Sequence, residues 1–234
     1  MTSSPTRKTS AATTISPGGL DNMEIDEKLS KISLDVLKMF ETTIRFLNES
    51  LDSYIHGKEA PAIDDDRVDR LERSVEKECL ILVLKERPFS KDLRKVTGIF
   101  KLVEDIERLG DHAEDLSWTI ARLAPYSRGV EIPSLQQEAK VAMSMVEDSY
   151  RSFAKGDDPL SLEVIKRDDV VDGLYLKALK EIPEFRDRYS LPDGFILYAT
   201  LMAKYWERVA DHASNIAEWV DYIETGCYKG EEIL

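Results

Sequence analysis

Apolar residues recur every three to four positions along most of this chain, which is the spacing of amphipathic helices rather than of strands. Glycine and proline residues interrupt the pattern and divide it into six long segments. No stretch shows the sustained alternation of apolar and polar residues that marks a half-buried strand. We therefore predict an all-α protein with helices over residues 22–56, 62–87, 90–124, 135–155, 158–182 and 193–225.

The second half of the chain repeats the first. Residues 107–113 (ERLGDHA) match residues 207–213 (ERVADHA), and residues 65–71 (DDRVDRL) match residues 168–174 (DDVVDGL) at nearly the same offset. Two such matches on corresponding helices indicate an internal duplication. The sequence thus predicts two tandem three-helix bundles, over residues 22–128 and 129–234, after a disordered Ser/Thr-rich tail at residues 1–21.

The charge balance limits the classes of partner. The chain has 45 acidic and 32 basic residues, for a net charge of −13. Such a surface repels nucleic acid and anionic lipid, so we expect no nucleic-acid partner and contact with a membrane only through other proteins. No apolar run approaches the roughly 18 residues of a membrane span. Cys79 and Cys227 form no disulfide or zinc motif, and Cys79 lies on an apolar face, so we expect a cytoplasmic protein with Cys79 in its core.

Four segments have the form acidic–x–x–x–Asp, one in each of the second, third, fifth and sixth predicted helices. Residues four apart share one face of a helix, with Cβ atoms about 5–6 Å apart, so each segment forms an acidic stripe. If short connections make the two helices of each repeat antiparallel, their stripes border a common groove. The paired residues are Asp65 and Asp69, Glu107 and Asp111, Asp168 and Asp172, and Glu207 and Asp211.

Four carboxylates in one groove suit hard cations that prefer oxygen ligands, namely iron(III), manganese, magnesium or calcium, and more than one ion in each repeat. Zinc is an alternative that this donor set suits less well, because the chain has few histidines and no suitable cysteine. The competing interpretation is a solvated acidic face, in which Arg108 and Arg208 neutralise the neighbouring carboxylates. We expect His112 and His212 to fill helix–helix contacts, and Gly110 to allow two helices to approach closely.

Motifs for catalysis are missing. The sequence has no Glu-x-x-His pair of the kind that di-iron oxidases carry, no phosphate-binding loop, no nucleophile elbow and no His-Glu-x-x-His. We therefore predict a protein that is not an enzyme.

These motifs together resemble the PhoU family of phosphate-uptake and phosphate-signalling regulators. The resemblance lies in the acidic segments at 107–112 and 207–218, in Arg87–Arg94 (RPFSKDLR) and in the Asp-rich starts of the second and fifth helices, and it covers about residues 24–228. It implies two repeats of three helices, with the eight acidic residues holding metal clusters such as multinuclear iron. It also implies a cytoplasmic homodimer that restrains a phosphate ABC transporter, through its ATPase subunit, and a sensor histidine kinase. The long N-terminal tail is not part of the family pattern.

Two other functions fit the same residues. An accessory subunit of a different ion transporter would use the same fold without phosphate signalling. A carboxylate-bridged metal oxidase or hydrolase would use the same acidic residues, but the missing Glu-x-x-His pair argues against it.

Overall fold

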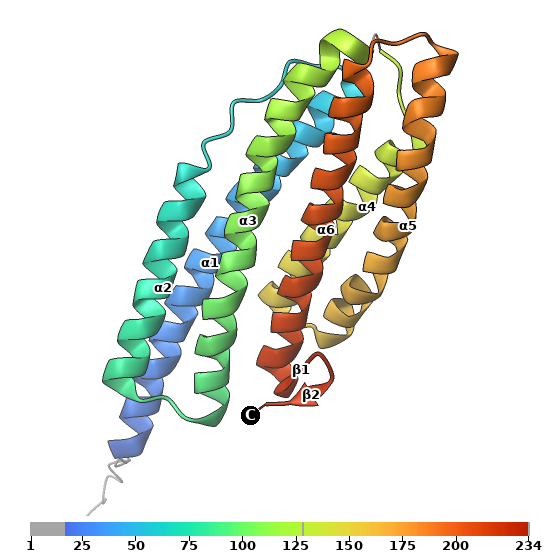
Figure 1. Cartoon of the computed structure of the whole chain (residues 1–234). Helices are drawn as coiled ribbons and strands as arrows, with labels where there is room; N and C mark the ends of the chain where they lie inside the picture. The colour runs from blue at the N-terminus through green and yellow to red at the C-terminus, as the bar shows by residue number, and fades with distance from the viewer. Residues whose placement is uncertain (1–16, 128, 234) are drawn as a thin grey trace, which may run out of the picture.

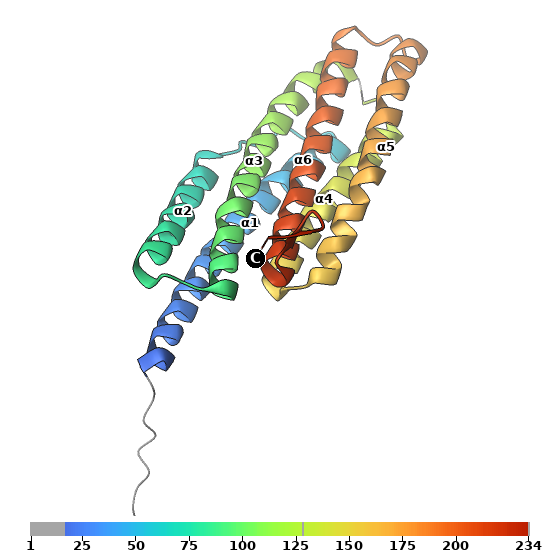
Figure 2. The ribbon, with the colours of Figure 1, turned by 60° about the horizontal axis from the view of Figure 1, so that its bottom comes forward.

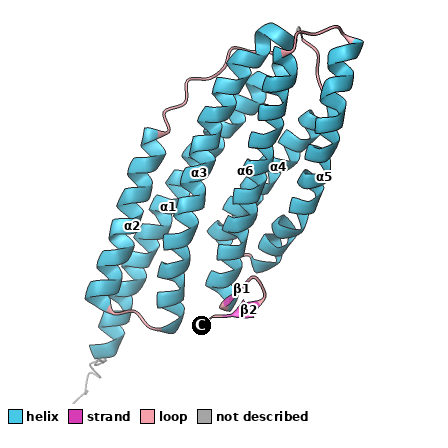
Figure 3. Cartoon of the chain, viewed as in Figure 1, coloured by secondary structure: helices cyan, strands magenta, loops and turns pink. Residues whose placement is uncertain are grey.

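Six long helices make up almost all of the protein, as the sequence predicts (Figures 1 and 3). The computed structural model describes residues 17–127 and 129–233, with side chains from residue 24 onward. The helices are α1 (Pro17–His56), α2 (Asp66–Glu86), α3 (Ser90–Ser127), α4 (Pro133–Lys155), α5 (Asp158–Arg188) and α6 (Gly194–Thr225). Helix α1 begins within the segment predicted to be a tail, and residues 1–16 of that segment lie outside the described residues.

Besides the start of α1, three helix ends differ from the prediction by three residues or more. Helix α2 begins at Asp66 rather than near residue 62, because Asp65 caps it by accepting a hydrogen bond from the backbone N–H of Asp66 at 3.0 Å. Helices α3 and α5 continue past Pro125 and Pro183. A proline has a helical φ and removes only one backbone donor, so a helix can continue where later residues still pack. Phe185, beyond Pro183, packs against the core.

A short hairpin follows α6 and was not predicted. It pairs β1 (Cys227–Tyr228) with β2 (Glu231–Glu232) in antiparallel register. The two turn residues, Lys229 and Gly230, both have positive φ, which matches the twist of a two-residue hairpin turn. The ring of Tyr228 stacks on Trp219 of α6 at a centroid distance of 4.0 Å, which holds the hairpin against the helix. Two-residue strands are too short for periodicity to reveal.

The helices form two bundles that lie side by side (Figures 1 and 2). Helices α1, α2 and α3 pack on one another, and α4, α5 and α6 do the same. The central helices α3 and α6 contact each other across the boundary, and α1 contacts α4. Helices α2 and α5 occupy opposite outer edges (Figure 1). Each acidic stripe on α2 or α5 therefore faces a stripe on a central helix of the same bundle.

Corresponding contacts within the two bundles support the duplication. The hydroxyl of Ser50 in α1 donates to the carbonyl of Ala113 in α3, and the hydroxyl of Ser149 in α4 donates to the carbonyl of Ala213 in α6. Gly110 lies where α3 meets α2, and a Cβ there would be 3.3 Å from the side chain of Val68. Close helix approach thus explains this glycine, as predicted, and Cys79 is buried in the same core.

One arginine of the Arg87–Arg94 segment joins the bundles. Arg94, near the start of α3, donates from Nε to the carbonyl of Ile223 at 3.0 Å and from Nη2 to the carbonyl of Glu224 at 3.1 Å. These carbonyls belong to the last turn of α6, which has no helical partner for them. A cation there also opposes the negative end of the helix dipole. The equivalent position before α6 has no arginine, so this link exists once.

Candidate metal centre

The groove between α2 and α3 brings three of the predicted ligands together. Asp69 of α2 and Glu107 and Asp111 of α3 each offer a carboxylate oxygen, and these oxygens lie within 4.8 Å of one another. All three side chains are partly buried. Within the described residues, this is the only group of three or more acidic, histidine or cysteine side chains with such spacing. Three oxygens converging at the edge of a groove fit a hard cation.

Burial and repulsion by neighbouring carboxylates raise the pKa values of two glutamates in this groove. Burial, then the charge of Asp111, raises the pKa of Glu107. Burial and the charge of Glu107 raise the pKa of Glu72, one turn along α2 from Asp69, to about 7. Glu72 was not among the predicted ligands. A bound cation would relieve this repulsion, because it favours the charged form of each carboxylate.

Two arginines partly neutralise the first cluster. Arg108 lies 2.9 Å from an oxygen of Asp111, and Arg73 lies 2.8 Å from an oxygen of Asp69. Both guanidinium groups are more than half exposed and approach from the solvent side. Exposed ion pairs contribute about 0–1 kcal/mol and exchange readily with water. The arginines therefore compete only weakly with a multivalent cation.

Asp65 lies further along the groove. As the cap of α2 it sits beside Glu114 rather than beside Glu107, and its charge is the largest cause of the raised pKa of Glu114. The antiparallel packing of α2 on α3 explains this displacement, since each step toward the start of α2 leads toward the end of α3. Asp65 is thus one turn away from the group formed by Asp69, Glu107 and Asp111.

The groove between α5 and α6 also brings acidic residues together, with different neighbours. Burial and the charge of Asp211 raise the pKa of Asp168 to about 6, and burial and the charge of Glu207 raise the pKa of Asp211. Asp172 is exposed, and its charge also raises the pKa of Asp168. Among the described residues, these four acids form no three-oxygen group of the spacing seen in the first repeat.

Two residues of the second repeat were missed by sequence reasoning. Lys204, one turn before Glu207 on α6, donates a hydrogen bond to the Glu207 carboxylate. Glu138 of α4 is completely buried, and neither of its oxygens has a hydrogen-bond partner among the described residues. Burial and the charge of Glu207 raise the pKa of Glu138 to about 9, and the ammonium of Lys204 opposes that rise. Glu138, Lys204 and Glu207 are therefore electrostatic neighbours.

The two histidines of the repeated motif lie between the central helices, as predicted, and not in the acidic grooves. The rings of His112 and His212 are 5.4 Å apart across the α3–α6 boundary. Nδ1 of His212 lies 2.8 Å from Oδ1 of Asp105, and Nδ1 of His112 lies 3.4 Å from Oδ2 of Asp115. Burial and the nearby His212 lower the pKa of His112. Each histidine thus has a carboxylate partner outside the predicted metal ligands.

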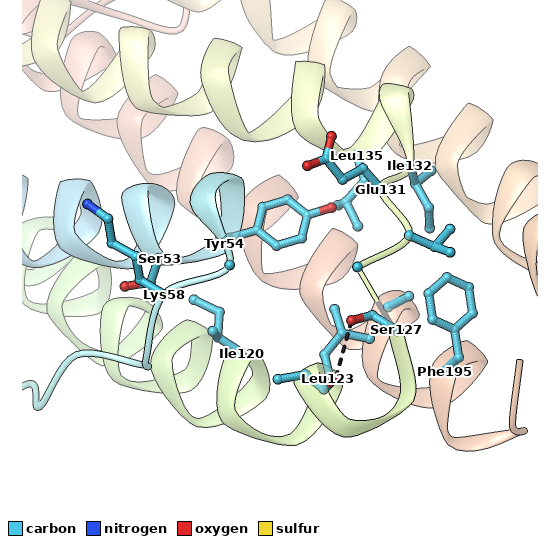
Figure 4. Close-up of a pocket in the computed structure, with 15 residues that line it drawn as sticks. Ser53, Tyr54, Lys58, Ile120, Leu123, Ser127, Glu131, Ile132, Leu135 and Phe195 are labelled. Carbon is cyan, nitrogen blue, oxygen red and sulfur yellow. Dashed lines mark hydrogen bonds between the residues drawn. The ribbon is translucent and has the colours of Figure 1, made fainter.

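A separate cavity of about 110 Å³ lies at the boundary of the two bundles. Figure 4 shows the rings of Tyr54 and Phe195 at this cavity, with Ile120, Leu123 and Leu135 completing much of its apolar wall. None of the eight predicted ligands lines it. The cavity is therefore distinct from the acidic grooves.

Comparison with known proteins identifies the family. A family model described as the PhoU domain matches the chain twice, over residues 36–119 and 135–220. The chain belongs to the PhoU family. The two matches cover both bundles and confirm the tandem duplication that the sequence predicts.

The PhoU relatives span nearly the whole chain. A phosphate-specific transport system accessory protein PhoU homolog from Synechocystis is 33% identical over 208 residues, covering 86% of this chain and 91% of that protein. A homolog from Thermotoga maritima is 28% identical and covers 88% of this chain and 91% of its own length. These relatives are named as accessory proteins of transport, and the PhoU family consists of regulators rather than enzymes, which confirms the non-enzymatic prediction.

Solved PhoU structures have the same fold. The crystal structure of PhoU from Pseudomonas aeruginosa has a TM-score of 0.66 at 25% identity, covering 89% of this chain and 99% of that one. The phosphate transport system regulatory protein PhoU from Streptococcus pneumoniae has a TM-score of 0.74 at 21% identity, with coverage of 87% and 98%. No helix in the described residues is long and apolar enough to cross a membrane.

Proposed function

We propose that this chain is a metal-binding negative regulator of phosphate uptake and phosphate-regulon signalling. The observation that supports it most directly is the pair of PhoU domains, together with 33% identity to a protein named as an accessory component of phosphate-specific transport. That relative is matched over 91% of its length, so the likeness extends to both repeats.

The metal part of the proposal rests on the first acidic groove. Asp69, Glu107 and Asp111 supply three oxygens of the type and spacing that a hard cation needs, and Glu72 lies beside them as a fourth carboxyl group. We favour iron, in a multinuclear cluster, over manganese, magnesium, calcium or zinc. A cation held there would neutralise the repelling carboxylates and tie the outer helix α2 to the central helix α3.

The partner part rests on charge and family. With a net charge of −13, the surface favours cationic protein surfaces, reached directly or through bound metal. By family likeness, the partners are the ATPase subunit of a phosphate ABC transporter and a sensor histidine kinase. The protein would act in the cytoplasm as a homodimer and reach the membrane only through these partners.

Uptake of labelled phosphate tests the regulatory role. A strain that lacks this chain should take up phosphate faster under phosphate excess, and expression of the wild-type chain should restore restraint. Glu163→Gln, on the exposed surface of α5, is a control that should also restore it. Equal uptake with and without the chain would contradict the proposal.

Elemental analysis of protein purified without chelator tests the metal part. The wild type should retain iron or manganese, and Asp69→Asn combined with Asp111→Asn should lose it without unfolding. Unchanged metal content in that double variant would show that the first groove is not the site, whatever the outcome of the uptake assay.

A further inference from the structure

One position beside the candidate ligands carries opposite charge in the two acidic grooves. In α3 the residue one turn before Glu107 is Glu104, and the matching residue before Glu207 in α6 is Lys204. Glu104 adds negative charge to the first groove, where it contributes to the raised pKa values of Glu107 and Glu72. Lys204 adds positive charge to the second. The repeats therefore share a fold and a motif but not a local charge.

Lys204 lies within the second acidic cluster rather than beside it. Its ammonium donates to Glu207, whose side chain is only 13% exposed. The same charge opposes the rise in pKa of Asp211 and of the buried Glu138. Its Nζ also lies 5.3 Å from the ring centroid of Tyr175 on α5, so it spans the groove between the two helices. The ammonium of Lys204 therefore lies among these acids where a bound metal ion would otherwise lie.

Within the part of the chain whose side chains are described, the first groove has no cation equivalent to Lys204. Its two basic neighbours, Arg73 and Arg108, bind from the solvent side, and Arg108 has a counterpart in Arg208 of the second groove. Three carboxylate oxygens of the first groove remain within 4.8 Å of one another, whereas the second groove forms no such group among the described residues. The position of the basic side chains and the spacing of the carboxylate oxygens both distinguish the first groove from the second.

We propose that Lys204 is a built-in counter-cation which makes the two repeats bind divalent metal unequally, tightly in the first and weakly in the second. A metal ion entering the second groove has to displace the ammonium from Glu207 and then sit near a like charge. This inference rests on the proposed metal binding and adds which repeat is filled first and which residue decides it. Lys204 acts through charge and is a specificity-determining residue, not a ligand.

Manganese binding to the full chain tests the inference, with free Mn²⁺ measured by electron paramagnetic resonance. The wild type should show a tight and a weak class of sites. Asp111→Asn should remove the tight class and Asp211→Asn the weak class. Lys204→Gln should strengthen the weak class by about tenfold or more, because it removes one unit charge at contact distance from a partly exposed site. The tight class should not change.

Two further variants sharpen the test. Lys140→Gln makes the same change in net charge at an exposed position of α4 and should leave both classes as in the wild type. Glu104→Lys should weaken the tight class, because it gives the first groove the charge of the second. Circular dichroism checks that each variant is folded.

The outcomes separate the inference from the proposed function. Two classes of equal affinity, or a weak class that Lys204→Gln leaves unchanged, would overturn the role of Lys204 while metal binding stands. Absence of Mn²⁺ binding in the wild type and in Lys204→Gln alike would overturn both, and would remove the metal part of the proposed function.

Discussion

Replacing the buried acid Glu138 with methionine should stabilise the protein and remove a defined part of its pH dependence. Glu138 is completely buried in α4, and neither carboxyl oxygen is hydrogen bonded within the described residues. The matched serine hydrogen bonds of α1 and α4 place Met39, also fully buried, at the corresponding position of the first repeat. Methionine is therefore a side chain that this fold already accommodates there.

The size of the effect follows from the pKa of Glu138. Burial and the Glu207 carboxylate raise this pKa from 4.5 to about 9, so the side chain is neutral in the folded protein near neutral pH. The unfolded chain loses the proton at a lower pH than the folded one. The contribution of Glu138 to the free energy of unfolding is therefore complete below the pKa that Glu138 has in the unfolded chain. It falls as the pH rises toward the pKa that Glu138 has in the folded protein. Each pH unit is worth about 1.4 kcal/mol, so about 3 kcal/mol is lost near pH 7.

Urea denaturation at several pH values measures this effect, followed by far-ultraviolet circular dichroism with chelator present. Other titrating groups are common to both proteins and cancel in the difference between the two unfolding free energies. The stabilisation by Glu138→Met should grow by up to about 1.4 kcal/mol per pH unit between about pH 5 and pH 8. Glu163→Gln, at an exposed position of α5, should show no such growth.

A constant difference between Glu138→Met and the wild type would refute this reasoning. It would show that Glu138 has the same protonation state in the folded and unfolded protein across that range. Destabilisation by Glu138→Met at every pH would likewise show that the carboxyl group has a favourable partner in the folded protein.

Three further predictions concern the contacts between helices. Gly98→Ala should destabilise the protein by about 1–3 kcal/mol in urea denaturation, because a Cβ there would lie 2.3 Å from Cγ1 of Ile223; an unchanged midpoint would contradict the close approach. Arg94→Met should lower the free energy of unfolding by about 1–3 kcal/mol, because two carbonyls of α6 lose this donor. A decrease below about 0.5 kcal/mol would show that water replaces the arginine. Added Mn²⁺ should slow amide hydrogen exchange in α2 by about tenfold or more, an effect that Asp111→Asn should abolish and that should be absent from α4.

The helices and their duplication could be predicted because each depends on short-range patterns. Apolar spacing and the breaks at Gly57 and Gly156 are local properties of the chain. The helix ends predicted at Pro125 and Pro183 were wrong, because a proline weakens a helix without always ending it, and Phe185 packs against the core beyond Pro183.

Which acidic residues lie together could be predicted only in part, because it depends on the register between antiparallel helices. The sequence places Asp65 and Asp69 on one face of a helix, but only packing decides that Asp69 meets Glu107 and Asp111 while Asp65 meets Glu114. Glu138 did leave a signal in the sequence. It lies three residues after Leu135 and four before Ala142, at a position that the helical period assigns to the core.

The location of the acidic grooves explains how metal binding could alter the surface that a partner protein meets. Among the described elements, helix α2 packs only against α1 and α3, and four of its side chains are fully buried. Along the groove its carboxylates repel those of α3, so the contact between these helices depends on the charge held there. A cation bound by Asp69, Glu107 and Asp111 would replace that repulsion with a bridge between the two helices. Helix α5 is held differently, because the ammonium of Lys204 already lies between α6 and Tyr175 of α5. If the proposed metal binding holds, the first repeat would carry the metal-dependent surface, and the second would hold its outer helix in place without metal.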